Sequence, residues 1–305
     1  MATRPLDLLD LPTLYRYRGE AVSLDSARLL TRGNPLSAAS FMAYVNPYRH
    51  VYTAVSADDS ATLLGGIIHT LDETYARLLY LAPASHLTHP SLPPLIEHLA
   101  AQAGEWGAFH VLAEVEETSN VFPALRMGGF SVYAWQRMWD ISNITEANSG
   151  SDWTRVHSVN LPAIQGLHHQ IVPPLLHPIE PAPRRAVGLM CTEDVKCYAN
   201  VSSGIYGIVL TPLIHPDATD VAEKLITLVS GLPDRRGRPV YVCVRSYQAW
   251  LEPVLEDLGA QAGARQAVMV KHLVRLIKDE QAVRAAQPAG VSVQPSRVSR
   301  LEGKK

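Results

Sequence analysis

Short apolar runs, separated by turn signals, divide the first half of the chain into alternating strands and helices. The run 111–115 is continuous and short, which predicts a buried strand, and residues 130–139 alternate between two faces, which predicts a second strand. Between them lies a helical stretch at 120–127 that ends at Gly128-Gly129, because glycine tolerates the positive φ with which a chain leaves a helix. We expect this part to fold as strand, helix, strand.

The same pattern of periods and turns extends over the rest of the chain. In the first half it predicts strands at 3–9, 51–55, 63–69 and 75–81, a helix that begins after the N-cap Asp10, and further helices at 24–31, 36–46 and 92–103. In the second half it predicts helices at 161–171, 219–230 and 249–258 and strands at 185–191, 195–202, 205–213, 239–245 and 263–272. The element order of the first half therefore recurs in the second.

A fixed offset of 130 residues relates the two halves. It maps Pro123 onto Pro253, Leu125 onto Leu255, Gly129 onto Gly259, Ala134 onto Ala264 and Gln136 onto Gln266. Self-similarity at one register is the mark of an internal repeat, so the chain is interpreted as a tandem duplication of one α/β module.

Length and composition agree with two globular domains. At 305 residues the chain exceeds the size at which a single core keeps growing. We expect an N-terminal domain at 1–141, a polar linker at 142–152, a C-terminal domain at 153–278 and a disordered tail at 279–305.

Charge and cysteine content narrow the class of protein. The net charge of −2 gives no basic field for nucleic acid, and no stretch approaches the length of a membrane span. Three cysteines, all in the second half, indicate a reducing compartment without a disulfide framework. We expect a cytoplasmic protein with neither a nucleic-acid nor a membrane partner.

The strand at 111–115, the Leu125-Arg126-Met127-Gly128-Gly129-Phe130 helix end and the strand after it carry a family resemblance. This unit resembles the GNAT (Gcn5-related N-acetyltransferase) superfamily, over nearly all of 1–140 and more faintly over 152–276. The resemblance implies an α/β fold with an α+β mixed sheet, present as a tandem duplicated GNAT-like acyl-CoA N-acyltransferase fold. It also implies acetyl-CoA or another acyl-CoA as cofactor and a small-molecule amine as acceptor.

In the family, the cofactor pyrophosphate lies on a glycine-rich loop before the third helix, with the pattern Gln/Arg-x-x-Gly-x-Gly/Ala. This chain has no glycine from Leu81 to Pro94, and its second copy, Thr211 to Lys224, has none either. Prolines at positions 90, 93 and 94 also remove N–H donors. The candidate cofactor-binding residues that the resemblance leaves are Leu81, Pro83, Ser85, His86, Thr88, Ser91 and Asn120.

Proton-transfer residues are the second requirement of the family's chemistry. The family's tyrosine acid is replaced by Leu125 and Leu255, and the nearest carboxylates to serve as a base are Glu114 and Glu116, which share a strand face. No metal is expected, because His168-His169 and His177 lack supporting Asp, Glu or Cys ligands.

Two functions from different classes follow from these residues. The first is an N-acyltransferase that moves an acyl group from CoA to an unknown amine, with the N-terminal domain the active one. The second is a catalytically inactive tandem scaffold or small-ligand-binding protein, which the missing glycines and tyrosine favour. The sequence leaves the oligomeric state open.

Overall fold

The computed structural model describes residues 2–37, 48–57, 61–144, 153–191, 195–233 and 235–273. The expected helix at 36–46, most of the linker at 142–152 and the tail at 279–305 therefore lie largely or wholly outside the described residues. Within the described ranges, no helix combines the length and apolar character needed to cross a membrane.

The first half contains the predicted strands and helices that fall in the described ranges, with ends shifted by a few residues, and one two-residue strand that the sequence did not predict. Its strands are β1 (Ala2–Pro5), β2 (Val22–Ser23), β3 (Arg49–Ala57), β4 (Thr62–Thr70), β5 (Tyr75–Ala82), β6 (His110–Glu116) and β7 (Ser131–Asp140). Its helices are α1 (Leu11–Arg16), α2 (Ser26–Arg32), α4 (Leu92–Glu105) and α5 (Val121–Met127).

The second half repeats this order with a shorter beginning. Its strands are β8 (Trp153–Arg155), β9 (Leu189–Cys191), β10 (Cys197–Ser203), β11 (Ile208–Ile214), β12 (Val240–Arg245) and β13 (Gln261–His272). Its helices are α6 (Leu161–Ile171), α7 (Val221–Ser230) and α8 (Leu251–Asp257).

All described strands belong to one mixed sheet. Its order is β1-β3-β4-β5-β6-β13-β7-β12-β11-β10-β9-β8, and the two-residue strand β2 pairs with β5 away from this path. Most neighbours are antiparallel, whereas β5 pairs with β6, and β11 with β12, in parallel. The same parallel pair thus occurs once in each half.

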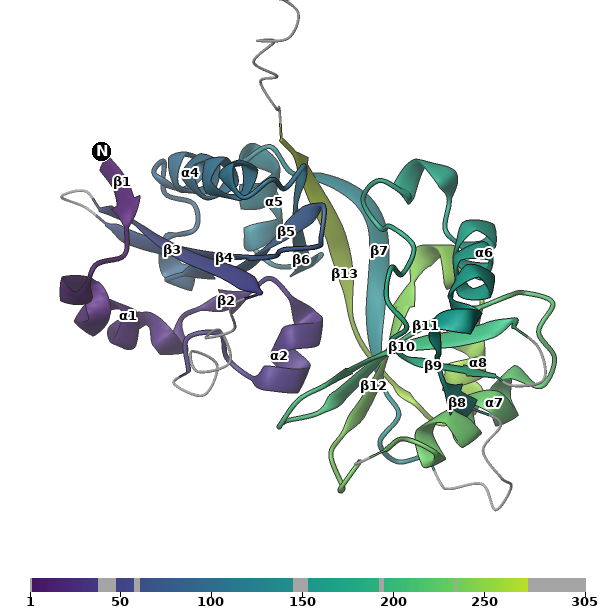
Figure 1. The fold of residues 1–305 in the computed structure, drawn as a ribbon. Coiled ribbons are helices and arrows are strands. Elements are labelled where there is room, and N and C mark those ends of the chain that lie inside the picture. The colour runs from purple at the N-terminus through teal and green to yellow at the C-terminus, as the bar shows by residue number, and fades with distance from the viewer. Residues whose placement is uncertain are drawn as a thin grey trace, which may run out of the picture. The chain divides into compact units, whose positions relative to one another are not determined.

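The last strand of each half lies in the sheet of the other half. Strand β13 pairs with β6 on one side and β7 on the other, and β7 then pairs with β12 (Figure 1). Because of this exchange, the two halves share one continuous sheet and meet along two central strands.

Helices cover both faces of the sheet in each half. In the first half, α4 and α5 bury one sheet face through Leu95, Ile96, Leu99 and Leu125, while α1 packs on the opposite face (Figure 1). In the second half, α7 and α8 cover one face and α6 covers the other. Each core is apolar and close to fully buried, as the hydrophobic effect requires of a stable domain.

The duplicated positions occupy equivalent places. Gly129 and Gly259 follow α5 and α8 with φ of 84° and 79°, in the left-handed region that favours glycine. Gln136 on β7 lies directly opposite Gln266 on β13, and its Nε2 donates to the Gln266 Oε1 at 2.8 Å. The repeated glutamines therefore meet each other between the two central strands.

Candidate functional site

Two arginines interrupt apolar strands near the junction of the halves. Arg77 stands in β5, within the sequence YARLLYLA, and Arg245 ends β12, within VYVCVR. An arginine in such a strand loses hydration, so it is tolerated only with charged or hydrogen-bonding partners. The partners of these two side chains define the candidate site.

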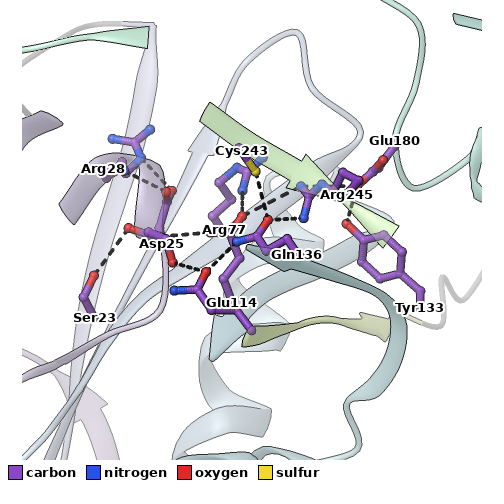
Figure 2. Close-up of polar contacts among 12 residues, drawn as sticks. Ser23, Asp25, Arg28, Arg77, Glu114, Tyr133, Gln136, Glu180, Cys243 and Arg245 are labelled. Carbon is purple, nitrogen blue, oxygen red and sulfur yellow. Dashed lines mark hydrogen bonds and ion pairs between the residues drawn. The ribbon is translucent and has the colours of Figure 1, made fainter. Parts of the chain in front are cut away.

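Glu114 on β6 is the carboxylate between the two arginines. It is only 4% exposed, and its Oε2 accepts the backbone N–H of Ser26 at 2.9 Å. Its Oε1 lies 3.5 Å from the Arg77 Nη1 and 3.9 Å from the Arg245 Nη2 (Figure 2). The sheet of the first half, the start of α2 and the end of β12 are thus joined at one side chain.

Glu180 holds the other side of Arg245. Its Oε1 lies 3.3 Å from the Arg245 Nη2 and accepts the Tyr133 hydroxyl at 2.9 Å, while its Oε2 accepts the Tyr247 hydroxyl at 2.8 Å. Arg245 also donates to the Gln136 Oε1. The guanidinium is therefore fixed by two carboxylates and an amide (Figure 2).

Asp25 and Arg28 form the remaining charged pair, at the start of α2. Asp25 accepts the backbone N–H of Arg28 at 3.0 Å, as an N-cap, and its Oδ2 lies 3.0 Å from the Arg28 Nε. The Arg28 Nη1 is buried and has no hydrogen-bond partner. A buried guanidinium N–H without an acceptor is uncommon, because it forfeits its hydration without compensation.

A cavity of about 410 Å³ lies between α2, β5 and β6 of the first half and β10 to β12 of the second, and its lining includes Asp25, Arg28, Arg77, Glu114 and Arg245. Arg77 and Arg245 also line a second cavity of about 200 Å³ on the side of Glu180. The volume of the larger cavity is in the range of small-molecule sites, and its lining is mostly polar and charged, which favours a polar ligand.

Three groups, Cys243 at the larger cavity and Tyr133 and Glu180 at the second cavity, have pKa values shifted so that they keep their usual charge states more firmly. Burial raises the pKa of the Cys243 thiol to about 12, and burial followed by Glu180 raises the pKa of Tyr133 well above its usual value. Burial opposes ionisation of Glu180, but Arg245 and the two tyrosine hydroxyls outweigh it and lower the pKa. At neutral pH these tyrosines and the thiol are therefore protonated and Glu180 is ionised.

The parallel strands β5 and β6 separate soon after they start to pair. They pair only from Tyr75–Arg77 to His110–Leu112. Beyond that point the Leu24 N–H donates to the Leu79 oxygen at 2.9 Å, and the Glu114 N–H donates to the Leu24 oxygen at 2.8 Å. The backbone of Leu24 thus closes the gap between the diverging strands.

The equivalent gap in the second half is closed by a side chain. Strands β11 and β12 pair in parallel only from Ile208–Leu210 to Val240–Val242. Gln248, which is 1% exposed, donates its Nε2 to the Pro212 oxygen at 2.8 Å and accepts the Ile214 N–H at 2.9 Å. Crevices at the carboxyl ends of parallel strands are common ligand sites in α/β folds, and both of these are occupied by the chain itself.

Six of the seven predicted cofactor-binding residues lie on the segment from β5 to α4, the exception being Asn120, and none of the seven lines the charged cavity. Ser85 and Thr88 are exposed, His86 is half-buried, and Leu81, Pro83 and Ser91 are buried. Several backbone N–H groups of this segment are bound within the protein, those of Ala84, His86, His89, Ser91 and Leu92.

Two features of this segment bear on an anionic ligand. The Ser85 Oγ donates to the Glu20 Oε2 at 3.2 Å, which places a carboxylate beside the loop. Leu81 is paired in register with Val22 of β2, so its sheet edge already has a neighbour. The predicted roles of these loop residues remain predictions.

The two carboxylates predicted as candidate general bases, Glu114 and Glu116, lie in different environments. Glu114 is buried at the cavity, whereas Glu116 is exposed. Asn120, the remaining predicted cofactor-binding residue, is also exposed and lies directly before α5. Sequence reasoning therefore selected one residue of the charged site, Glu114. It missed Arg77, Arg245 and Glu180, although a lone arginine in an apolar strand was a signal that could have identified the first two.

The three histidines at 168, 169 and 177 do lie together. Their ring centroids are 4.9 to 5.8 Å apart. Within the described ranges no group of three or more His, Cys, Asp or Glu side chains is arranged to hold a metal ion. Burial, followed by His177 and His169, lowers the pKa of His168 to about 4, so this ring is neutral in the folded protein.

Comparison with known proteins identifies the fold. No protein-family model and no curated protein matches the sequence. Among solved structures, a GCN5-related N-acetyltransferase from Sphaerobacter thermophilus matches with a TM-score of 0.52 and 13% identity, covering 89% of this chain and 95% of that one. A tandem GNAT protein from the clavulanic acid biosynthesis pathway matches with a TM-score of 0.51 and 11% identity, covering 89% and 98%.

These matches span nearly the whole of both chains, so the relationship includes both halves. The chain has the tandem GNAT fold, which confirms the resemblance and the α/β fold class that the sequence predicts. Identities this low establish a shared fold, and function has to be argued from the site.

Proposed function

We propose that this protein binds a small polar molecule in the cavity between its two halves and does not transfer acyl groups from CoA. A small-ligand-binding protein is the non-catalytic function that the sequence also predicts. The ligand would lie among Arg28, Arg77, Glu114 and Arg245.

The main support for this proposal is the gap between β5 and β6, which the backbone of Leu24 occupies. Leu24 is hydrogen-bonded to β5 and to β6, and Val22 continues the pairing along β5. An extended cofactor arm could reach these backbone groups only by breaking bonds that already exist. The corresponding groups of β11 are bound by Gln248, so neither half offers an empty crevice there.

Electrostatics at the loop support the same conclusion. Binding of a pyrophosphate needs free N–H groups at a helix N-terminus and no neighbouring negative charge. The N–H groups of the loop that are named above are already donated within the protein, and the carboxylate of Glu20 lies beside Ser85.

The pKa values of four groups, one at this cavity and three at the second cavity, favour binding over proton transfer. A general acid or base works best with a pKa near the working pH. The pKa values of Tyr133, Tyr247 and Cys243 are raised and that of Glu180 is lowered, so all four are moved away from neutrality. They are suited to holding fixed hydrogen bonds and charges.

A thermal-shift screen of acetyl-CoA, CoA and a set of small metabolites tests the proposal directly. A ligand that binds only the folded state stabilises it by about 2.7 kcal/mol at a hundred times its Kd. We expect at least one small metabolite to raise the Tm and acetyl-CoA to leave it unchanged at millimolar concentration. A micromolar Kd for acetyl-CoA by titration calorimetry, or no shift from any metabolite, would contradict the proposal.

Hydrogen exchange adds a control for the strand gap itself. The Leu24 and Glu114 amides should stay protected with and without acetyl-CoA, because their hydrogen bonds lie inside the sheet. Loss of protection on addition of acetyl-CoA would show that the cofactor displaces this segment.

Acyl transfer in the first half is the second candidate function, and the position of Glu114 favours it. A buried carboxylate at the end of β6, open to a cavity, is placed as a base for an amine. If this function holds, release of free CoA thiol with an amine panel should fall at least a hundredfold in Glu114→Gln. The matched variant Glu116→Gln, on the same strand but exposed, should keep its rate.

A further inference from the structure

The charges that line the larger cavity are unbalanced. Five arginines, at positions 28, 32, 49, 77 and 245, line it with the carboxylates of Asp25, Glu73 and Glu114, and a fourth carboxylate, Glu180, pairs with Arg245 from the second cavity. With low-dielectric walls, such a lining produces a positive potential that concentrates anions. The imbalance points to a negatively charged ligand.

The donors and acceptors of the lining side chains independently indicate a negatively charged ligand. Asp25 already accepts from the backbone and side chain of Arg28, and Glu114 accepts from Ser26 and is paired with arginine. Arg77 has a single ion pair of 3.5 Å in this set, and the Arg28 Nη1 has no partner. The donors in excess are guanidinium N–H groups, whose best acceptors are carboxylate or phosphate oxygens.

The uncharged residues of the lining indicate the chemical character of the rest of the ligand. Thr31, Asn200, Ser202, Ser203 and Thr211 contribute hydroxyl and amide groups, and few apolar side chains accompany them. Asn200 and Thr211 also line the second cavity, as Arg77 and Arg245 do. Such a surface matches a molecule with several hydroxyl groups better than an alkyl chain.

We infer that the cavity binds a small hydroxylated organic anion, a carboxylate or a phosphate monoester, whose acidic group is held by Arg28 and Arg77. This inference rests on the proposed function and gives it a ligand class. Arg245 keeps its own partners, Glu180 and Gln136, and positions the cavity wall.

The experiment is calorimetry of the full chain, at fixed ionic strength, with four related probes. Gluconate and glucose 6-phosphate carry the two acidic groups, sorbitol is neutral and glucosamine is cationic. We expect one or both anions to bind and sorbitol and glucosamine to bind at least tenfold more weakly. Gluconate against glucose 6-phosphate separates a carboxylate site from a phosphate site.

Arg28→Gln is the variant of choice, because Arg28 lines the cavity and Asp25 would keep the backbone N–H of residue 28 as a partner, so the fold should be spared. It should weaken anion binding by at least about tenfold, as expected for a charged hydrogen bond. Arg77→Lys is the second variant, which keeps the charge beside Glu114 and removes bidentate geometry. Arg126→Gln on α5, which is exposed and outside the cavity lining, is the matched control and should bind as the wild type does.

Three outcomes would overturn the inference. They are equal binding of sorbitol and the anions, anion binding that Arg28→Gln does not change, and no binding of any probe at 10 mM. The acetyl-CoA titration described above separately decides the proposed function, because a micromolar Kd there would defeat it whatever the sugar probes do.

Discussion

His168 shows how burial fixes the charge of a single residue. The ring lies on α6, is 5% exposed and has an Nδ1 without a hydrogen-bond partner. Its folded pKa of about 4 is below the unfolded value of about 6.5, chiefly because of burial. Between these two values the unfolded chain binds more protons than the folded one does.

The first prediction concerns stability against pH. Because the folded pKa is the lower one, the contribution of neutral His168 is complete above about pH 6.5 and is lost as the pH falls to about 4. The loss should be at most about 1.4 kcal/mol per pH unit. Urea unfolding from pH 7.5 to 4.5 measures it, and His168→Gln should have a shallower dependence. An unchanged slope in the variant would contradict the assignment.

Residue types alone predicted part of the site. Glu114 could be selected because it is a carboxylate on the expected face of a strand. The partners of Glu180 and Arg245 could not be predicted, because their side-chain hydrogen bonds span 47 to 109 residues in sequence, from Tyr133–Glu180 to Arg245–Gln136. Only folding brings them together.

At the scale of elements, the diverging strands of the two halves are closed in different ways. In the first half a backbone segment fills the gap, and in the second half the amide of Gln248 does so. Both solutions satisfy backbone groups that would otherwise be buried without partners. The two copies of the module therefore share the diverging strand geometry but differ in the groups that bridge the gap.

The second prediction concerns the side chain of Gln248, which closes the gap between β11 and β12. Gln248→Leu keeps the volume of the side chain but leaves the Pro212 oxygen and the Ile214 N–H unpaired. Each buried unpaired group costs about 1–3 kcal/mol, so chemical denaturation should show a loss of about 2–6 kcal/mol. Gln261→Leu, at the exposed start of β13, is the control and should change stability by less than about 0.5 kcal/mol. Equal small effects would mean that water replaces the amide.

Sequence periodicity predicted most elements but could not assign their neighbours. The alternation of β7 and β13 identifies each as a strand, and this alternation is the same whichever strand lies beside it. The strand β2 was not predicted, because two residues are too short to show a period. The repeat did place Gly129 and Gly259 at equivalent helix ends, since glycine is required there by φ.

At the scale of the whole molecule, the exchanged strands make the halves mutually dependent. Without β13, strand β6 would have an open edge, and without β7, strand β12 would have one. Open sheet edges aggregate readily. The first half alone would also lose part of its hydrophobic core, because Ala267 and Met269 of β13 belong to that core.

The third prediction follows from this dependence and uses a chain cut between residues 147 and 148. Fragments 1–147 and 148–305, expressed together, should copurify as a folded pair. Expressed alone, each should be insoluble or lack a cooperative thermal transition. A single half that unfolds cooperatively by itself would contradict the prediction.

The covalent link between β7 and β8 therefore contributes less to holding the molecule together than the sheet does. A protein with this connectivity is, in effect, an intertwined homodimer whose subunits have been joined end to end and have then diverged. Its unfolding should be one event for both halves. A substitution in either core would then lower the stability of both halves together, including the cavity at their junction, so selection on one half acts on the other.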